Sequence, residues 1–225
     1  MRGVFFYLMS LFKNFKKQFD NSVKSSGRSL NEIDLIAVSK KKSVEDIRQV
    51  IKAGHRSFGE NQIQEVESKW IDLKKEYPDL KLHFIGGIQS RKVKSIYLHC
   101  DVVHSIDRIK IIELFNQLEK QYGVTKEYFI QINTGNEDQK NGVNLSEAEK
   151  FITNSLNNYK LNIIGLMCLP PLNEDPKKHF LKLAEFASKF KLPSLSMGMS
   201  GDFEEAIESG ATHIRIGTQI FGARN

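Results

Sequence analysis

The sequence predicts an α/β protein with the architecture of a single (β/α)8 TIM barrel. Eight short apolar runs alternate with segments of helical periodicity, which is the element count of such a barrel. The chain has 225 residues, a length at which α/β barrels commonly form one domain. Its last two apolar runs each end in glycine beside serine or threonine, and barrels often bind phosphate after their seventh and eighth strands.

An extra helix is expected before the barrel. Phe12, Phe15 and Phe19 recur at helical spacing, which gives this segment one apolar face. We predict that residues 1–27 form a leading helix packed on the barrel, and that residues 28–225 form the single barrel domain.

The first residues of that segment leave alternatives open. Gly3–Phe12 is apolar and follows Arg2, as in the core of a secretory signal, but no small-residue cleavage site comes after it. The stretch is also too short to span a bilayer. A helix on the barrel is the preferred interpretation, and the alternatives are an export signal, a start further upstream and a membrane role.

The first four strand and helix pairs alternate from residue 34 onward. Ser43 and Asp46 have the spacing of a capping box, which predicts a helix start after the first strand, and Gly54 suits the end of that helix. Pro78 stops the next helix. The expected strands are Asp34–Ser39, Ser57–Gly59, Leu82–Ile85 and Val102–Ile106. The expected helices are Ser43–Gly54, Asn61–Tyr77, Ser90–Leu98 and Arg108–Tyr122.

The second half repeats this alternation. Leu161–Leu169 is apolar on both faces, as a parallel strand covered on both sides should be. Ser146 and Glu149 have capping-box spacing after the polar loop Thr134–Asn144. The expected strands are Glu127–Asn133, Leu161–Leu169, Ser194–Met197 and Thr212–Ile216. The expected helices are Ser146–Asn157, Asp175–Phe190 and Asp202–Ser209.

The alternative architecture is a doubly wound open sheet. That fold places a glycine-rich phosphate-binding turn after its first strand. Here Val38–Ser43 stands at that position and contains three consecutive lysines but no glycine. The barrel is therefore preferred.

The net charge of +6 favours a small anionic ligand over nucleic acid. Lysines alternate with acidic residues along most of the chain. The sequence lacks the basic stripe interleaved with aromatic residues that would indicate nucleic-acid binding. Cys100 and Cys168 lie in apolar surroundings without metal-ligand spacing. We expect them to be buried thiols of a protein from a reducing compartment.

The loops after the last two strands predict a phosphate site. Ser200 and Thr218 offer hydroxyl donors, and Gly201 and Gly217 allow the backbone to approach a ligand closely. The helix starts that follow add positive potential. Glycine and serine are also ordinary turn residues, and this is the alternative interpretation of either loop alone.

Lys40 is the candidate reactive residue because it directly follows the first strand. At the mouth of a barrel, partial removal from water would lower the pKa of the amine and allow it to attack a carbonyl carbon. The alternative is that Lys40 is the first of three solvated lysines. We favour a phosphorylated aldehyde held between Lys40 and the last two loops.

Arg215 lies among isoleucines in the last strand, where an arginine cannot be buried without a partner. A salt bridge to a neighbouring strand is one interpretation, and a ring nitrogen of a ligand is the other. Four further polar residues lie at or near strand ends: Asn61, His83, Gln89 and Asn133. The remaining strand-end histidines, His99, His104 and His213, are expected at the surface or with satisfied hydrogen bonds, and no spacing predicts a metal site.

Six motifs in order resemble the pyridoxal-phosphate homeostasis proteins, which are single-barrel relatives of the alanine racemase N-terminal domain. The resemblance covers about residues 28–225 and leaves residues 1–12 outside. The motifs are Ala37–Lys40, Phe58–Asn61, His83–Gly86 with Gln89, Gly165–Pro170, Leu195–Ser200, and Arg215–Thr218 with Phe221–Arg224.

The resemblance implies a pyridoxal 5'-phosphate site. Lys40 would form the Schiff base with the aldehyde, and Arg215 would face the pyridine nitrogen. The phosphate would be held by Ser200, Gly217 and Thr218, with Gly201 beside them, and Asn61, His83 and Met199 would line the cofactor. The chain departs from the family pattern at Gln62, Leu82 and Arg91, beside the site rather than on Lys40 or the phosphate loops.

The implied function is a carrier of the cofactor that serves vitamin B6, amino-acid and keto-acid homeostasis in the cytoplasm. An arginine against the ring nitrogen disfavours its protonation, which weakens the ring as an electron sink, and Lys40 supplies an acid or base on one face only. A monomer is expected, with apo-enzymes that use pyridoxal phosphate as recipients and with neither nucleic acid nor membrane as partner. The alternatives are an amino-acid racemase or lyase, and an aldolase that acts on a sugar phosphate through Lys40.

Overall fold

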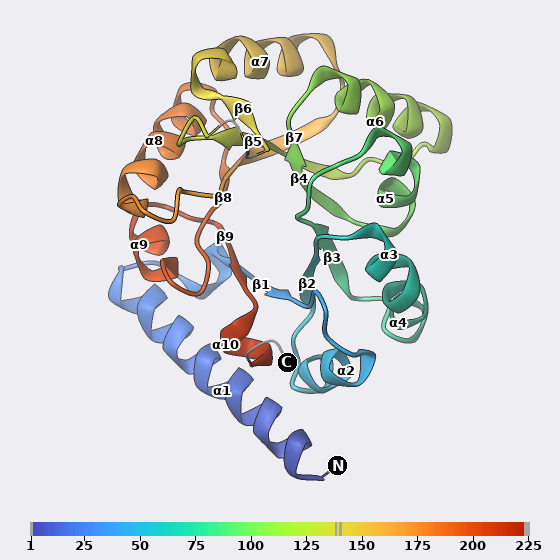
Figure 1. Cartoon of the computed structure of the whole chain (residues 1–225), viewed down its shortest axis with the longest axis vertical. Helices are drawn as coiled ribbons and strands as arrows, with labels where there is room; N and C mark the ends of the chain where they lie inside the picture. Colours follow the sequence, from blue (N-terminus) through green and yellow to red (C-terminus); the bar gives the residue numbers. More distant parts are fainter. Residues whose placement is uncertain (1, 138, 140, 223–225) are drawn as a thin grey trace.

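Eight parallel strands close into a barrel in the part of the chain that the structure describes (Figure 1). The computed structural model describes residues 2–137, 139 and 141–222. The predicted barrel is confirmed, and the pairing of β4 with β5 excludes the open sheet because it closes the row of eight strands that runs from β4 through β1 and β9 to β5. The barrel strands are β1 (Asp34–Val38), β2 (Ser57–Glu60), β3 (Lys81–Phe84), β4 (Val102–Ile106), β5 (Glu127–Asn133), β7 (Asn162–Cys168), β8 (Ser194–Ser196) and β9 (His213–Ile216).

Helices follow the strands and form the outer ring. The helical segment that follows β2 has three parts, because a five-residue π-helix at Val66–Trp70 separates α3 from α4. The helices around the barrel are α2 (Val44–Lys52), α3 (Ile63–Glu65), α4 (Ile71–Glu76), α5 (Val93–His99), α6 (Ile109–Tyr122), α7 (Leu145–Asn158), α8 (Pro176–Lys189), α9 (Phe203–Glu208) and α10 (Thr218–Phe221). Short 3-10 turns occupy Leu30–Glu32 and Ser90–Lys92.

Of the two helix starts predicted from capping-box spacing, one is confirmed and one is wrong. Ser43 caps α2 as expected, and its hydroxyl accepts a hydrogen bond from the Asp46 N–H at 3.1 Å. The predicted cap at Ser146 is wrong, because α7 begins at Leu145 and Asn144 precedes it. The cause is a two-residue strand, β6 (Val143–Asn144), that pairs with β5 and brings the helix start forward. Asp138 and Lys140 of the predicted polar loop lie outside the described residues.

The leading helix α1 (Arg2–Ser25) lies across α2, α9 and α10 (Figure 1). The three phenylalanines predicted to form its apolar face are all buried. The ring of Phe15 packs edge-on against that of Phe203 in α9, with ring centroids 5.4 Å apart. Met1 and residues 223–225 of the predicted units lie outside the described residues. Among the helices described, none combines the length and the apolar character needed to cross a bilayer.

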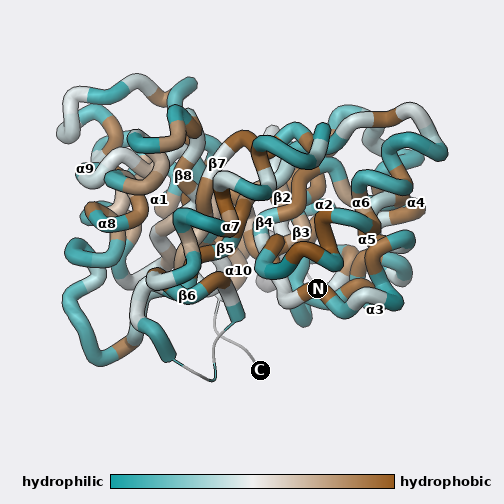
Figure 2. Tube along the Cα trace, turned by 90° about the horizontal axis from the view of Figure 1, so that it is seen from above, coloured by the Kyte–Doolittle hydropathy of each residue, from teal (hydrophilic) through white to brown (hydrophobic). Residues whose placement is uncertain are grey.

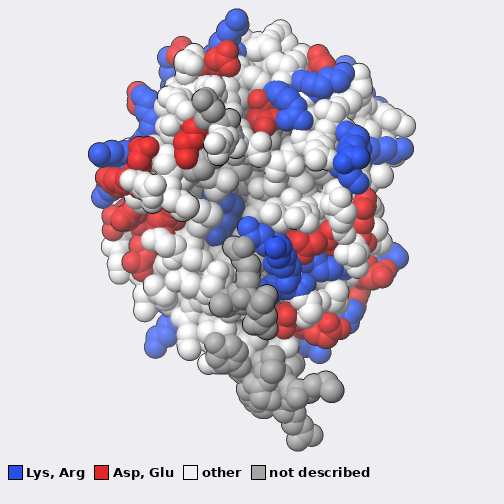
Figure 3. All heavy atoms as spheres, in the orientation of Figure 1, with Lys and Arg blue, Asp and Glu red and all other residues white. Residues whose placement is uncertain are grey.

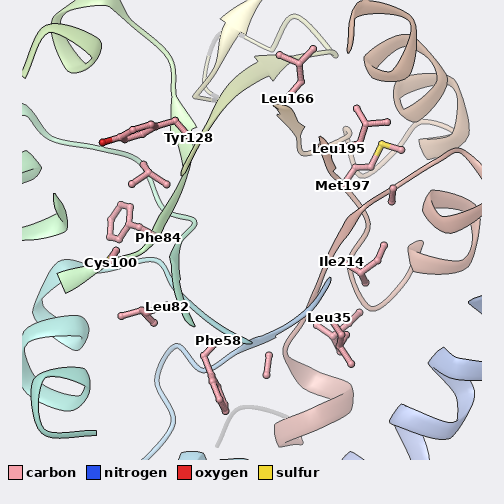
Figure 4. Packing of buried hydrophobic residues seen from close by; sticks show 14 of the residues in the cluster. Leu35, Phe58, Leu82, Phe84, Cys100, Tyr128, Leu166, Leu195, Met197 and Ile214 are labelled. Carbon is pink, nitrogen blue, oxygen red and sulfur yellow. The ribbon is translucent and has the colours of Figure 1, made fainter. Parts of the chain in front are cut away.

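The outer face of the barrel wall is the main apolar core. In Figure 4, Phe58, Leu82, Tyr128 and Ile214 project from the strands away from the barrel axis and toward the helices. Figure 2 shows the same division along the chain, with brown strands and largely teal outer helix turns. Both cysteines are buried as thiols, as predicted.

The inner face of the wall has a different composition. His104 of β4 contacts Ser196 of β8, and His83 of β3 contacts His213 of β9, although neither pair of strands is adjacent. Such contacts are possible only through the barrel interior. Phe129 of β5 stacks on His104 with ring centroids 4.4 Å apart. The interior therefore combines aromatic and polar side chains with a small apolar cluster of Val102, Phe129 and Met167, whereas branched aliphatic residues dominate in most barrels of this kind.

Candidate functional site

A pocket of about 470 Å³ opens at the carboxyl ends of the strands, where barrels place their active sites. Figure 3 shows Lys and Arg side chains beside the hollow at the centre of this face. The predicted site residues that line this pocket are Lys40, Asn61, Met199, Ser200, Gly201, Arg215, Gly217 and Thr218. They come from β1, β2, β8 and β9 or from the loops after these strands. The chain folds them together although 178 positions separate Lys40 from Thr218.

A buried ion cluster holds the loop that carries Lys40. Lys69 donates to the Ser39 carbonyl at 3.0 Å and pairs with Glu60 at 2.6 Å and with Glu65 at 2.7 Å. Glu65 in turn accepts from the backbone N–H of Lys41 at 2.6 Å, a residue with φ of 59°. That left-handed conformation costs energy for a lysine, and these contacts compensate for it. The position of Lys40 is therefore set by its two neighbours in the chain.

The π-helix explains how Lys69 and Trp70 both reach this cluster. Trp70 donates its indole N–H to Glu60 at 3.1 Å, although it directly follows Lys69 in the chain. Adjacent helical residues diverge by about 100° in an α-helix, and the wider turn brings them to one acceptor. Burial raises the pKa of Glu60, and Lys69 opposes that rise.

The two loops after β8 and β9 offer hydrogen-bond donors to the pocket. Among the described residues, the backbone N–H groups of Ser200, Gly201 and Thr218 have no protein acceptor. A Cβ added at Gly201 would meet no atom within 4 Å, so this backbone faces open space. The N–H of Met199 is already used, because Asp202 accepts from it at 2.5 Å. Since α9 and α10 have only six and four residues, the loop N–H groups rather than helix dipoles are the stronger donors.

Arg215 is 4 % exposed and lies between neighbouring strands. Its guanidinium donates to Ser196 Oγ at 2.6 Å and to the Cys168 carbonyl at 3.0 Å. Burial lowers its pKa from the ordinary value, and Asp202 opposes this shift. Among the described residues, the hydrogen-bond partners of the Arg215 guanidinium are a hydroxyl and a carbonyl rather than a carboxylate, so the salt bridge expected as one alternative is not found there. Its remaining N–H groups are available at the pocket wall.

His83 does not line the pocket. It is fully buried inside β3 and contacts Ser57 at 3.0 Å and His104 at 2.9 Å. His104 and His213 are also buried rather than at the surface, and both have hydrogen-bond partners. Burial lowers the pKa of His213 to about 3 and that of His83 and His104 well below the ordinary value. These histidines are therefore neutral at physiological pH.

The pocket contains residues that the sequence did not single out. Gln131 of β5 is 5 % exposed and donates to the Asn141 carbonyl at 2.9 Å, and both residues line the pocket. The alternation of side chains along β5 was the available signal, because it places Gln131 on the same face as Asn133 and Phe129. Asn133 instead holds the following loop through Glu137, and Gln89 lines a neighbouring hollow of about 310 Å³.

The fold and the pocket define a barrel of the alanine racemase N-terminal class. The family model described as "Alanine racemase, N-terminal domain" matches residues 17–225, and the match begins inside α1. An alanine racemase from Clostridium difficile superposes with a TM-score of 0.70 at 11 % identity over 91 % of this chain and 55 % of that one. This likeness concerns the fold alone.

Closer relatives identify the family within that class. The pyridoxal phosphate homeostasis protein of Vibrio alginolyticus is 42 % identical over 88 % of this chain and 90 % of its own, and that of Aquifex aeolicus is 35 % identical over 92 % and 94 %. PipY of Synechococcus elongatus, solved with PLP bound, has a TM-score of 0.83 at 28 % identity over 96 % of this chain and 100 % of that one. The chain belongs to the pyridoxal phosphate homeostasis protein family.

Proposed function

We propose that this protein binds pyridoxal 5'-phosphate reversibly through Lys40 and takes part in vitamin B6, amino-acid and keto-acid homeostasis. One observation carries the proposal: an amine, a guanidinium and two donor loops from distant parts of the chain line one pocket. The names of the relatives and the PLP-bound PipY structure support the same ligand.

The residues of the pocket fit this ligand. Asn61 Oδ1 is buried and has no hydrogen-bond partner in the described structure, so it is an acceptor for a ligand donor. The open space over Gly201 and the N–H groups of Ser200 and Thr218 suit a phosphate, because backbone N–H groups arranged in a turn bind anions well. Arg215 at the wall suits a ring nitrogen that accepts a hydrogen bond.

The residues of the pocket and of the Lys69 cluster have separate roles in this proposal. When bound, pyridoxal phosphate supplies an aldehyde carbon that an amine attacks reversibly with loss of water. Lys40 Nζ is the attacking amine, and the Lys69 cluster holds its loop. Ser200, Gly201, Gly217 and Thr218 fix the phosphate end. Arg215 keeps a positive charge at the ring nitrogen and so opposes protonation there.

The lining residues favour a carrier over a racemase or lyase. A racemase needs a proton donor or acceptor on each face of its substrate. Among the described residues, those that line the pocket include neither tyrosine, histidine, cysteine nor a carboxylate, and Lys40 is the amine present. Proton exchange at the α-carbon of an amino acid in deuterated water, abolished in Lys40→Ala, would instead support the racemase.

We extend the proposal to the setting in which the cofactor is held. Lys40 is only partly buried and Thr218 is exposed, so the ligand can leave through the mouth. We propose that apo-enzymes are recipients, that the protein acts as a monomer and that it works in the cytoplasm. Activation of an apo-enzyme by the loaded protein, at a rate that depends on the concentration of the loaded protein, would support direct transfer.

Titration of the purified protein with pyridoxal phosphate tests the proposal. Wild type should take up one equivalent with a change in absorbance that Lys40→Ala abolishes. Lys41→Asn is the matched control, because it removes the adjacent exposed amine while asparagine tolerates the left-handed conformation at this position. Uptake by Lys40→Ala equal to that of wild type, or no uptake by wild type, would contradict the proposal.

A further inference from the structure

A chain of hydrogen bonds runs through the interior of the barrel, from the pocket to the opposite mouth. It begins at Arg215, whose guanidinium donates to Ser196 Oγ at 2.6 Å. Ser196 Oγ lies 2.8 Å from His104 Nδ1, and His104 Nε2 lies 2.9 Å from His83 Nδ1. His83 Nε2 lies 3.0 Å from Ser57 Oγ. The middle three residues, Ser196, His104 and His83, are completely buried.

The chain ends on a carboxylate at the start of β1. Asp34 Oδ2 is 3.5 Å from His83 Nε2, and Ser57 also interacts with Asp34. The side chain of Asp34 is 28 % exposed, so it lies at the amino-terminal mouth of the barrel. A cation at the pocket and an acidic group at the far side are therefore connected through two histidines and two serines.

The donor and acceptor chemistry fixes the direction of every bond. Arginine can only donate, so Ser196 accepts from Arg215. The hydroxyl hydrogen of Ser196 has no acceptor other than His104 Nδ1 among the described residues. A neutral His104 then carries its hydrogen on Nε2 and donates it to His83 Nδ1, and His83 likewise donates from Nε2 toward Ser57 and Asp34. All the donors thus point away from Arg215.

We propose that His104, acting through Ser196, is a positioning residue that holds the Arg215 guanidinium against the ring nitrogen of bound pyridoxal phosphate. The physical reason is that His104, by accepting the hydroxyl hydrogen, turns a lone pair of Ser196 Oγ toward Arg215 and leaves no buried hydroxyl hydrogen without an acceptor. Stacking on Phe129, with an interplanar angle of 17°, fixes the His104 ring in turn. The ligand identity in this inference rests on the proposed function.

His213 provides a matched control. It is a buried histidine of the same interior, and its ring centroid lies 5.8 Å from that of His104. Its ring nitrogen bonds Thr212 at 2.8 Å and takes no part in the chain to Arg215. A change at His213 therefore disturbs the same core without removing the acceptor of Ser196.

The first experiment needs no ligand. In the full-length cofactor-free protein labelled with ¹⁵N, long-range nitrogen to hydrogen correlation spectra report which ring nitrogen carries the hydrogen. We expect neutral His83 and His104 with the hydrogen on Nε2 in both at pH 7. A hydrogen on Nδ1 of His104 would contradict the proposed direction of the hydrogen bonds from Arg215 to Asp34.

The second experiment measures pyridoxal phosphate binding to full-length variants. His104→Leu and Ser196→Ala should bind about tenfold more weakly than wild type, the expected loss for one hydrogen bond to a charged group, and should shift the absorbance band of the bound cofactor. His104→Asn should restore both, because its side-chain oxygen can replace Nδ1 as acceptor. His213→Leu should lower the melting temperature but leave the affinity and the band unchanged.

The outcomes separate the inference from the proposed function. Equal affinity and band position in Ser196→Ala, His104→Leu and His213→Leu would overturn the positioning role while wild type still binds the cofactor. Because Ser196→Ala is a small truncation, it decides the question if His104→Leu does not fold. Failure of wild type to bind pyridoxal phosphate would refute the proposed function, and the spectra of the cofactor-free protein would still decide the direction of the chain.

Discussion

The outer face of the barrel wall packs apolar side chains against the helices, whereas the inner face adds three histidines, a serine and an arginine to a small apolar cluster around Phe129. The outer layer is close to what any stable barrel requires, because burial of apolar surface drives folding. The inner layer is costly to bury and needs a partner for every polar atom. The difference indicates that the outer layer determines stability and that the inner layer supports the pocket above it.

Truncation in the outer layer should produce the largest loss of stability. Phe58 is fully buried and packs on Trp70 with ring centroids 5.1 Å apart. Phe58→Ala should cost about 3–5 kcal/mol of unfolding free energy, from lost burial and the cavity left behind, as measured by urea unfolding. Leu172→Ala is the control: Leu172 is 93 % exposed, so its truncation should cost less than about 0.5 kcal/mol. Equal losses of unfolding free energy in the two variants would contradict the conclusion that the outer layer determines stability.

The inner layer should make stability depend on pH. Burial lowers the pKa of His213 to about 3, below the value near 6.5 of an unfolded histidine. The unfolded chain therefore binds more protons below pH 6.5, and stability falls as the pH decreases. This shift at His213 should cost about 2 kcal/mol between pH 6.5 and pH 5.

A neutral replacement isolates this contribution. His213→Asn should flatten the dependence of unfolding free energy on pH below 6.5 by about one proton, whereas Leu172→Ala should leave the slope unchanged. Asp34 and Glu60 act in the opposite sense, because burial raises their pKa and their contribution to stability is lost as the pH rises. An unchanged slope in His213→Asn would show that His213 is not buried in its neutral form.

A smaller effect is expected at the start of α2. Ser43 accepts from the Asp46 N–H at the helix start, on the outer ring and away from both layers. Ser43→Ala should lower the unfolding free energy by about 1 kcal/mol without changing ligand affinity, and Ser43→Asp should retain most of the stability because aspartate also caps. A loss in Ser43→Asp as large as that in Ser43→Ala would remove the capping explanation.

The outer layer was predictable from the sequence, and the inner layer was not. All eight strand positions followed from local apolar runs in the sequence. β6 and the π-helix depend on tertiary contacts: β6 on its pairing with β5, and the π-helix on the convergence of Lys69 and Trp70 on Glu60. No pattern within one segment contains that information.

The pocket shows the same distinction. Lys40 follows the end of its strand and lines the pocket, whereas His83 lies within β3 and belongs to the interior. Both residues are polar and close to a strand end, so residue type alone could not separate them. Their level along the barrel axis depends on the register between strands, which the sequence of one strand does not specify.

Covalent mapping of the bound cofactor tests the central claim most directly. The protein is loaded with pyridoxal phosphate, reduced with borohydride, digested and analysed by mass spectrometry. The account predicts one phosphopyridoxyl group, located on Lys40, and its absence from Lys40→Ala. A label on another lysine, or a label spread over many surface lysines and unchanged in Lys40→Ala, would contradict it.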